Sequence, residues 1–440
     1  MTGLELSLIA FAVMLVAIFL RIPIGVSMAI TGFVGTWIVR GSPTPVLAQL
    51  KSLTYDTFSD YSLSIVPLFL LMGQFATKSG MSRDLFRAAA DWVGHFKGGM
   101  AIAAVGASAG FGAVCGSSLA TASTMGQVAL PELKRHGYSD RLSTGVLAAG
   151  GTLGILIPPS LILVVYAIIA EQNIIKMFVA ALIPGVLAAI GYMITVSIYV
   201  WIYPDSATAR NRVPFRQRFR NLLRTWPVFV IFIGVIGGIY KGWFTPTEGA
   251  AVGVVVTGLY GWVTSTLDFQ GFKDSILATA SSTGMIFFII FGAKLFNAFL
   301  ATTQTPQGLA MWVGSQELSP MLILIVMLLC YLVFGCVMDS LSMILLTIPI
   351  FFPIVQALDF GLTPEETAIW FGIIALIVVE IGLITPPVGM NLFIISSIAK
   401  DVPVTETYKG VAPFIISDIL RVAILLAFPP ITLWLVQISF

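Results

Sequence analysis

The chain has 440 residues, of which 58% are hydrophobic and only 10% are charged. This composition and a mean hydropathy of +0.98 exclude a soluble protein and predict an all-α protein that crosses a lipid bilayer several times. The formal net charge of +2 is too small to indicate nucleic-acid binding. We therefore expect residues 1–440 to form one multi-pass membrane protein.

A helix needs about 20 mostly apolar residues to span a membrane. The segments predicted as membrane helices are 4–20, 24–40, 55–77, 176–203, 226–240, 247–266, 276–301 and 410–437. No basic region precedes the first of them and no small-residue cleavage site follows it, so we interpret it as a retained helix rather than a signal peptide. Small residues, polar residues or proline interrupt four other apolar stretches, which are 100–131, 142–170, 319–358 and 366–398.

The positions of basic residues indicate which side of the membrane a loop faces. Six arginines between residues 204 and 225 predict a cytoplasmic loop. Basic residues also flank the stretch 100–131 on both sides, with Lys78, Arg83 and Arg87 before it and Lys134, Arg135 and Arg141 after it. Because both ends are then cytoplasmic, this stretch is predicted to be a re-entrant helical hairpin. Counting onward, the stretch 319–358 re-enters from the opposite side.

Two apolar stretches contain a Pro-Pro pair that a glycine precedes by four positions: Gly154 before Pro158, and Gly382 before Pro386. Proline lacks the backbone donor and clashes with the preceding turn, so neither stretch forms an unbroken helix. The freed backbone groups must be buried in protein or line a cavity. Two interrupted helices in corresponding halves of a sequence indicate the binding site of a secondary transporter.

Together these features predict an inverted repeat, in which each half has one hairpin followed by one broken helix. The spacing agrees, since Pro131 follows Ser118 by thirteen positions and Pro353 follows Ser340 by thirteen. The predicted parts are N-terminal scaffold helices (1–92), a first transport repeat (93–171), scaffold helices with the basic loop 204–225 (172–275), a second transport repeat (276–400) and a C-terminal helix (401–440).

The predicted hairpin tips contain candidate binding residues. Ser117 and Ser118 offer amides and hydroxyls to an anion and carbonyls to a cation. In the second hairpin, Asp339 lies deep in an apolar run beside Ser340. A carboxylate inside a membrane is costly and is a functional hypothesis by default; the alternative is an N-cap, and the two interpretations are compatible. Glu380, just ahead of the second break, is equally well explained as a structural residue.

Oxygen atoms at the tips and breaks predict one Na⁺ site in each repeat, because unwound carbonyls at half-helix ends coordinate Na⁺ in transporters. The predicted Na⁺ ligands are Ser117, Ser118, Gly151, Gly154 and Pro158 in the first repeat and Gly335, Met338, Gly382, Thr385 and Pro386 in the second. The predicted substrate-binding residues are Ser117, Ser118, Ser160, Lys294, Asp339, Ser340 and Asn391.

Lys294 places a positive charge inside the predicted helix 276–301. One interpretation is that it snorkels to a surface or pairs with an acid. The other is that it faces the cavity and attracts a substrate carboxylate. Asp418 and Arg421 are three positions apart on the last predicted helix, so we interpret them as a structural pair.

Sequence motifs give no support for an enzyme. Gly106-Ala-Ser108-Ala-Gly110 fits G-x-S-x-G, but that motif requires a strand-to-helix turn and a histidine partner, and its context here is an apolar helix. The sequence has no Walker A motif, HExxH motif or dinucleotide fingerprint. We therefore predict a non-enzymatic protein that an ion gradient drives.

Three motifs resemble one known family. The runs at 106–118, 147–160 and 380–391 are similar to those of the DctM-type large membrane subunits of tripartite ATP-independent periplasmic (TRAP) transporters. The resemblance implies an elevator-type, Na⁺-coupled importer of small organic acids in a bacterial inner membrane. It also implies two partners: a small four-helix membrane subunit of the DctQ type and a periplasmic substrate-binding protein. Sialic acid members have an arginine in the region that corresponds to residues 299–304, where this chain has none, which leaves Lys294 as the candidate cation.

Two alternatives to this function stay open at the level of sequence. A stand-alone Na⁺/divalent-anion symporter has the same arrangement of re-entrant hairpins but works without a binding protein. A passive channel or structural membrane protein is the alternative from another class, although paired broken helices argue against it.

Overall fold

The computed structural model describes residues 3–315 and 318–440, and within these ranges the chain folds into α-helices and two short 3-10 turns. Several helices begin where the sequence carries a start signal. Thr245 and Thr363 each precede a proline and form a capping box, in which the threonine side chain and a glutamate three residues later satisfy each other's backbone N–H groups. Local sequence therefore sets many of the helix starts.

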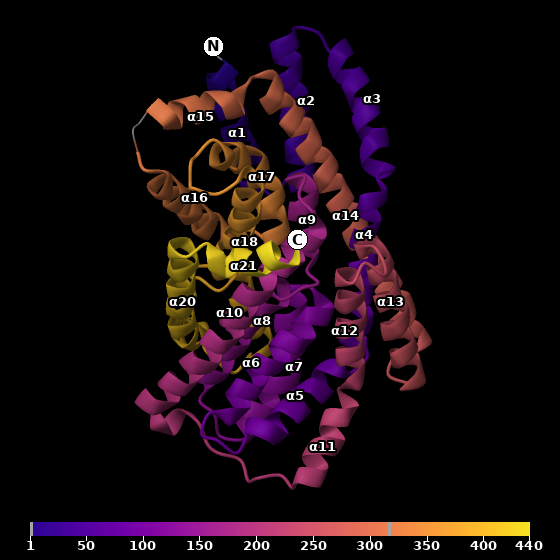
Figure 1. Ribbon diagram of the computed structural model, residues 1–440, viewed down its shortest axis with the longest axis vertical. Helices are drawn as coiled ribbons and strands as arrows, with labels where there is room; N and C mark the ends of the chain where they lie inside the picture. Colours follow the sequence, from indigo (N-terminus) through magenta and orange to yellow (C-terminus); the bar gives the residue numbers. More distant parts are fainter. Residues whose placement is uncertain (1–2, 316–317) are drawn as a thin grey trace.

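One group of helices forms most of the right-hand side of Figure 1, with only its first helix lying toward the upper left. In this outer group, α2 packs along α14, and α4 packs against both α13 and α14. Its members are α1 (Gly3–Phe19), α2 (Ile24–Arg40), α3 (Thr44–Phe58), α4 (Ile65–Lys78), α12 (Trp226–Tyr240), α13 (Pro246–Val263) and α14 (Phe269–Thr302).

Two helical hairpins approach the middle of the molecule from opposite ends. Helices α6 (Gly99–Cys115) and α7 (Ser118–Arg135) lie in the lower half of Figure 1, whereas α16 (Pro320–Gly335) and α17 (Ser340–Gln356) lie in the upper half. The helices of each hairpin pack against each other. Their tips, at residues 116–117 and 336–339, are only two and four residues long.

The two predicted broken helices are present. The first is α8 (Asp140–Leu156) followed by α9 (Leu161–Ile169), which are bent by 46° relative to each other. The second is α18 (Pro364–Leu383) followed by α19 (Met390–Ile398). Every residue of α8 from Leu142 to Leu156 and of α18 from Thr367 to Leu383 is buried. Helices that are apolar on all sides belong inside a bundle, and α8 and α18 form its centre.

Three further helices complete the bundle around α8 and α18. They are α10 (Ile174–Ile202), α20 (Val404–Ala427) and α21 (Pro430–Ser439). Helix α10 packs against α6, α8, α9, α18, α20 and α21, so its neighbours belong to both repeats. Glycines bring α20 close to α8, because a Cβ atom built on Gly145 would lie 2.3 Å from the carbonyl oxygen of Gly410.

Three shorter helices connect the outer group with the bundle. They are α5 (Met81–Val93) between α4 and α6, α11 (Phe215–Arg224) between α10 and α12, and α15 (Thr305–Ser315) between α14 and α16. Helices α5 and α11 pack against each other at the lower end of Figure 1.

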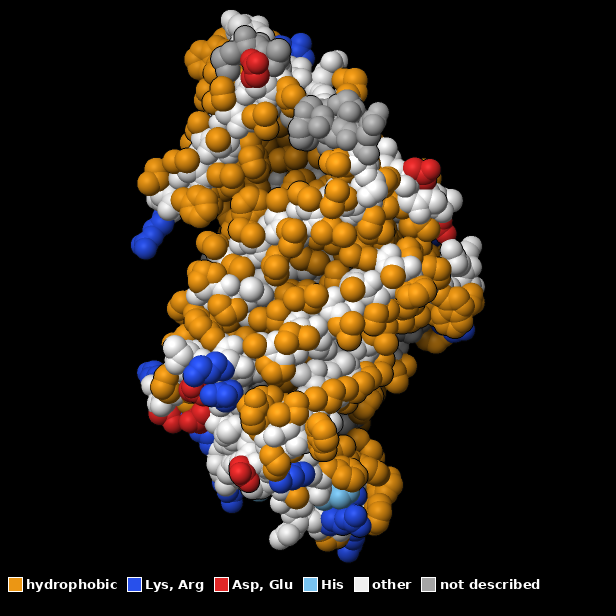
Figure 2. Space-filling model, turned by 90° about the vertical axis from the view of Figure 1, so that its left-hand side faces the viewer, with side chains coloured by type: hydrophobic (Ala, Val, Ile, Leu, Met, Phe, Trp, Pro, Cys, Tyr) orange, Lys and Arg blue, Asp and Glu red, His pale blue; other side chains and the backbone are white. Residues whose placement is uncertain are grey.

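The surface agrees with a position inside a membrane. Figure 2 shows hydrophobic side chains over most of the middle of one face, with charged side chains mostly near its lower end and edges. In the described part of the chain, α10, α14, α18 and α20 are each long and apolar enough to span a membrane, and two bent pairs add up to two more spans. Apolar side chains exposed in this way are stable against lipid and costly in water.

Several predicted segments differ from the observed helices. Segments 24–40 and 226–240 match α2 and α12, but the single segment 55–77 is wrong because a 3-10 turn at Tyr61–Ser64 separates α3 from α4. The C-terminal segment is also not one helix. It leaves helical geometry at Phe428, because a residue before proline disfavours the α conformation.

The basic segment 204–225 is only partly a loop. Apolar side chains recur in it at helical spacing, at Phe215, Phe219 and Leu222, and residues Phe215–Arg224 form α11. The division of the chain into scaffold and transport parts is a functional division, and it stays a prediction.

Candidate functional site

One buried carboxylate joins the tips of the two hairpins. Ser118 and Ser340 are the first residues of α7 and α17, and both donate their hydroxyl hydrogens to Glu380 of α18. The Ser340 bond, from Oγ to Oε1, is 2.6 Å long, and Ser118 bonds to the other carboxylate oxygen, Oε2. Glu380 is 1% exposed. A buried carboxylate is tolerated only with such partners, so Glu380 holds the two tips together.

Both tips end in an N-cap residue of the same kind of geometry. Ser117 and Asp339 are the N-caps of α7 and α17, and each has an extended backbone. The Asp339 carboxylate accepts bonds from the backbone nitrogen and the hydroxyl of Ser342, at 3.1 and 2.5 Å. The predicted cap at Asp339 is therefore confirmed. Its role toward substrate stays a prediction.

The first tip lies against the first helix break. A Cβ atom on Gly154 would lie 2.8 Å from the carbonyl oxygen of Ser117 and 2.5 Å from the hydroxyl oxygen of Thr121, so only glycine fits there. Gly116, at φ +65°, brings the tip next to Pro159 in the break. The Thr121 hydroxyl is buried and has no hydrogen-bond partner among the described residues.

The second tip lies against the second break in a similar way. The backbone nitrogen of Gly389 donates a 3.0 Å bond to the carbonyl oxygen of Cys336, which ties the break to the tip. A Cβ atom on Gly382 would lie 2.6 Å from the carbonyl carbon of Gly335. Each predicted repeat thus contributes one glycine contact between a hairpin tip and a broken helix.

Asn391 and Ser160 occupy buried positions near the breaks. The Asn391 amide donates a 3.3 Å bond to the carbonyl oxygen of Ala148, so α19 of the second broken helix contacts α8 of the first. Its Oδ1 atom is buried without a partner in the described part of the chain. Ser160 is the N-cap of α9, where its hydroxyl accepts a 3.5 Å bond from Leu163. Asn391 therefore retains an open acceptor, whereas Ser160 caps a half-helix.

Lys294 lies on α14, outside the contacts around Glu380. It is half-buried, and no hydrogen bond or ion pair connects it to another described residue. Its neighbour Ala293 belongs to a small apolar cluster with Leu346 of α17, and Met338 of the second tip packs against that cluster. Lys294 thus lies on a helix that passes the second hairpin, as an unpaired cation among described residues.

Oxygen atoms of the backbone and of hydroxyl groups gather where the hairpin tips meet the helix breaks. No group of three or more His, Cys, Asp or Glu residues in residues 3–315 and 318–440 is placed to hold a metal ion. Carbonyls at Ser117 and Gly335 and the Thr121 hydroxyl are oxygen donors beside unwound backbone. Oxygen donors of this kind are those that half-helix ends offer to Na⁺.

A second buried network occupies the position in the first broken helix that corresponds to Glu380. Thr152 lies two residues before Gly154, as Glu380 lies two residues before Gly382. Its hydroxyl is 2.9 Å from that of Tyr192, which donates a 2.6 Å bond to Asp418. Asp418 accepts a 2.8 Å bond from Arg421, so the predicted pair is confirmed and extends to α8.

The sequence interpretation left Glu380 out of the predicted site, although it joins both tips. The available signal was a lone acid two residues before a break glycine in an apolar run. Its cost in a membrane indicates function but identifies no partner. Only the fold brings Ser118 and Ser340 to it.

The protein is a multi-pass helical protein in which the tips of two hairpins meet two broken helices. This arrangement defines a membrane permease with discontinuous helices. The chain belongs to the DctM family of TRAP transporter subunits. The family model described as "Tripartite ATP-independent periplasmic transporter, DctM component" matches residues 11–431. The protein is therefore a multi-pass bacterial permease subunit and not an enzyme.

Known proteins agree with this membership. The chain is 37% identical to the C4-dicarboxylate TRAP transporter large permease protein DctM of Pseudomonas aeruginosa, over 93% of this chain and 92% of that protein. It is 30% identical to the sialic acid TRAP transporter large permease protein SiaM of Vibrio cholerae, over 96% of each. The fold is similar to that of the YdaH transporter of Alcanivorax borkumensis, with a TM-score of 0.65 and 14% identity over 87% of this chain and 88% of that one.

Proposed function

We propose that this permease subunit imports small organic acids across the bacterial inner membrane by Na⁺ symport. The observation that supports this function best is the joining of both hairpin tips by Glu380. Each tip also lies against a helix break, at Gly154 or Gly382. Carboxylates inside membrane proteins and interrupted helices at corresponding positions are both typical of ion and substrate pathways in transporters.

Each repeat is proposed to hold one Na⁺ ion. The proposed oxygen donors are Ser117, Ser118, Gly151, Gly154 and Pro158 in the first repeat and Gly335, Met338, Gly382, Thr385 and Pro386 in the second. A bound ion would use oxygen atoms at and beside the breaks; the carbonyls of Ser117 and Gly382 already accept one backbone bond each and would use their second lone pair. The residues around Glu380 position these donors by holding the two tips together.

Transport is proposed to follow an elevator mechanism on an inverted repeat. The bundle of hairpins and broken helices, with α10, α20 and α21 packed on it, is the moving part in this proposal. The outer group of helices is the scaffold, and α5, α11 and α15 are the connections between the two. The opposite directions of the hairpins in Figure 1 support this division.

We propose that the protein works with a DctQ-type small membrane subunit and a periplasmic substrate-binding protein, as the tripartite family description suggests. The named relatives transport C4-dicarboxylates or sialic acid. Residues 299–304 contain no arginine. A small carboxylate, with Lys294 as its cation, is therefore the proposed substrate class.

Uptake into proteoliposomes tests the whole proposal. The permease, the small subunit and the loaded binding protein are reconstituted with an inward Na⁺ gradient, and accumulation of labelled acid is measured. We expect accumulation that requires both Na⁺ and the binding protein. Equal uptake with K⁺ in place of Na⁺ would contradict Na⁺ coupling. Uptake without the binding protein would indicate a stand-alone symporter, and downhill flux without coupling would indicate a channel.

Cysteine labelling tests the inverted repeat. Cys115, Cys330 and Cys336 are replaced by alanine, and single cysteines are introduced at Arg135, at the end of α7, or at Asp359, after α17. Both positions are exposed. Because the hairpins approach from opposite ends, an impermeant thiol reagent is expected to label the first only from the cytoplasm and the second only from the periplasm. Labelling of both from one side contradicts the repeat. The region near Gln316, also predicted to be periplasmic, lies outside the described residues.

Substitution of Lys294 tests its role toward substrate. We expect Lys294→Gln to raise the half-saturation concentration of loaded binding protein about tenfold, since loss of one charged contact of about 1.4 kcal/mol has that effect. Lys51→Gln, on the exposed face of α3, is the matched control. If Lys294→Gln lowers the thermal unfolding midpoint and leaves transport kinetics unchanged, the lysine is structural.

A further inference from the structure

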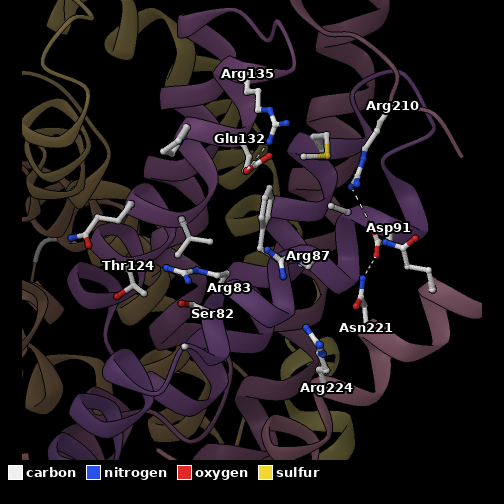
Figure 3. Close-up of a pocket in the computed structure, with 18 of the residues that line it drawn as sticks. Ser82, Arg83, Arg87, Asp91, Thr124, Glu132, Arg135, Arg210, Asn221 and Arg224 are labelled. Atoms are coloured by element: carbon white, nitrogen blue, oxygen red, sulfur yellow. Dashed lines mark hydrogen bonds and ion pairs between the residues drawn. The ribbon is translucent and has the colours of Figure 1, made fainter. Parts of the chain in front are cut away.

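A large basic chamber lies away from Glu380, between α5, α7 and α11 (Figure 3). Its volume is about 1660 Å³, and its lining contains eight Lys or Arg residues but only two acidic ones, Asp91 and Glu132. The six-arginine segment of the sequence contributes four of the lining arginines, Arg210, Arg216, Arg220 and Arg224. The positive-inside rule explains basic residues on this side, but it does not require them to surround a cavity.

The acidic residues of the lining are already paired. Asp91 is buried and accepts bonds from Arg210 at 3.1 Å and from Asn221 at 2.5 Å, the dashed lines of Figure 3. Glu132 lies 3.9 Å from Arg135 and from His136. The lining arginines that form no ion pair among the described residues are Arg83, Arg87, Arg216, Arg220 and Arg224.

The nearby carboxyl of Asp84 offsets only part of this charge. Burial raises the pKa of Asp84 although the arginines around it act in the opposite direction. Even with Asp84 ionised, the eight basic side chains of the lining outnumber the carboxylates of Asp84, Asp91 and Glu132. The chamber therefore keeps an excess of positive charge, and a concave basic surface concentrates anions.

Direct contacts between α5 and α11 fix two walls of the chamber. Asp91 of α5 bonds to Asn221 of α11, and Trp92 and Phe219 meet edge to face with ring centroids 5.6 Å apart. These contacts fix α5 and α11 relative to each other, so the arginines on both helices face one space. The helix positions are therefore set before an anion binds, whereas the exposed arginine side chains would become ordered on binding.

The chamber also extends along α7 toward the hairpin tip. Ser123, Thr124 and Gln127 of α7 line it. Ser123 is five residues after Ser118, which corresponds to about 7.5 Å along the helix axis. The chamber therefore lies on the same helix as the Ser118 tip, although Ser118 and Glu380 are themselves buried and do not line it.

A soluble anion fits the chamber better than a phospholipid. The nearest apolar groove, about 490 Å³, is lined by Leu85, Trp92 and Phe229 among others. Residues 82, 83, 86, 87, 90 and 91 of α5 line the chamber, whereas 85, 88, 89, 92 and 93 line the groove. At 100° per residue all of the second set except Val93 lie on the face of α5 opposite the first set, so the helix separates most of the groove from the arginines.

We propose that the chamber is a second anion site, at the cytoplasmic end of the permease, that binds small dicarboxylates through arginines of α5 and α11. The choice of carboxylate rests on the proposed function. Guanidinium groups bind carboxylates through paired N–H bonds, and an acid with two carboxylates reaches both helices at once. A dicarboxylate that accumulates in the cytoplasm would occupy the same site.

Calorimetric titration of the purified permease with succinate in Na⁺-free buffer tests the proposal. Succinate is expected to bind the wild type saturably, and Glu380→Gln is expected to bind it equally. A triple glutamine variant should bind succinate at least tenfold more weakly; it combines Arg83→Gln, Arg87→Gln and Arg224→Gln. Arg212→Gln is the matched control, because Arg212 is exposed in the same basic segment but does not line the chamber. The corresponding triple lysine variant keeps the charge, so part of the binding should return.

Several outcomes would overturn the site. The first is that the folded wild type shows no saturable succinate binding. The second is that the triple glutamine variant binds succinate as well as the wild type does. The third is that the wild type binds inorganic phosphate or phosphatidylglycerol vesicles but not succinate. Thermal unfolding midpoints identify any variant that fails to fold. If the triple glutamine variant does not fold, succinate binding by the triple lysine variant decides whether the arginines form the site. This result is separate from the uptake assay, because binding is measured without Na⁺, small subunit or binding protein.

Discussion

Glu380→Gln is expected to leave the permease folded and to reduce Na⁺-driven uptake by about 100-fold or more. Glutamine has the same shape and keeps one acceptor oxygen for a serine hydroxyl, so the tips stay bridged. It removes the only charge that contacts both Ser118 and Ser340 in the described part of the chain. Loss of about 2.7 kcal/mol of interaction with a bound cation corresponds to a 100-fold loss of affinity.

Uptake and the thermal unfolding midpoint are both measured for this variant. Glu365→Gln is the matched control, because it makes the same change at the exposed start of the same helix, where Glu365 forms a surface ion pair with Lys176. Surface pairs contribute about 0–1 kcal/mol, so this control should transport normally. Near-normal uptake by Glu380→Gln would show that the charge is dispensable and that Glu380 is structural.

Glu380→Ala separates the two roles further. It leaves both serine hydroxyls without their partner and opens a cavity, which together cost roughly 2–5 kcal/mol. We therefore expect loss of stability as well as transport in the alanine variant. Loss of transport alone is expected in the glutamine variant.

Gly382→Ala is expected to abolish transport through packing rather than through charge. The new Cβ atom would lie 2.6 Å from the Cα and carbonyl carbon atoms of Gly335, and backbone cannot rotate away as a side chain does. Overpacking of this kind costs about 1–3 kcal/mol. It would push the second tip away from the break and lengthen the Ser340–Glu380 bond. Gly154→Ala is expected to do the same at the first tip.

The matched control is a glycine with free space. A Cβ atom on Gly284 of α14 would meet nothing within 4 Å. Gly284→Ala should therefore leave uptake unchanged and stabilise the helix by up to about 1 kcal/mol. Uptake and unfolding midpoints are compared for the three variants. Wild-type uptake by both Gly382→Ala and Gly154→Ala would mean that the close contacts at the tips are not needed for transport.

Local chemistry in the sequence predicted much of the fold. Hydrophobic length located α2 and α12 at their observed bounds, and proline placed both helix breaks. These features depend on a few neighbouring residues, because a proline disrupts a helix whatever packs around it. The same local rule explains why the C-terminal segment is two helices, because Phe428 precedes two prolines.

The hairpin tips were only partly predictable. Glycine and serine in an apolar run indicate a turn, and an aspartate there indicates a cap, as Ser117 and Asp339 turned out to be. Helices α5 and α11 were missed because polar and apolar residues alternate in them, which lowers the hydropathy that the prediction of membrane helices relies on.

Sequence by itself determined the class of protein, the breaks and the family motifs, because composition, helix length and proline act locally. Tertiary structure alone decided that Glu380 joins tips 262 and 40 residues away along the chain and that Thr152 reaches Asp418 through Tyr192. It also decided that arginines scattered along the sequence line one open cavity. A buried polar group signals that it needs a partner, but the packing of distant helices selects which partner it meets.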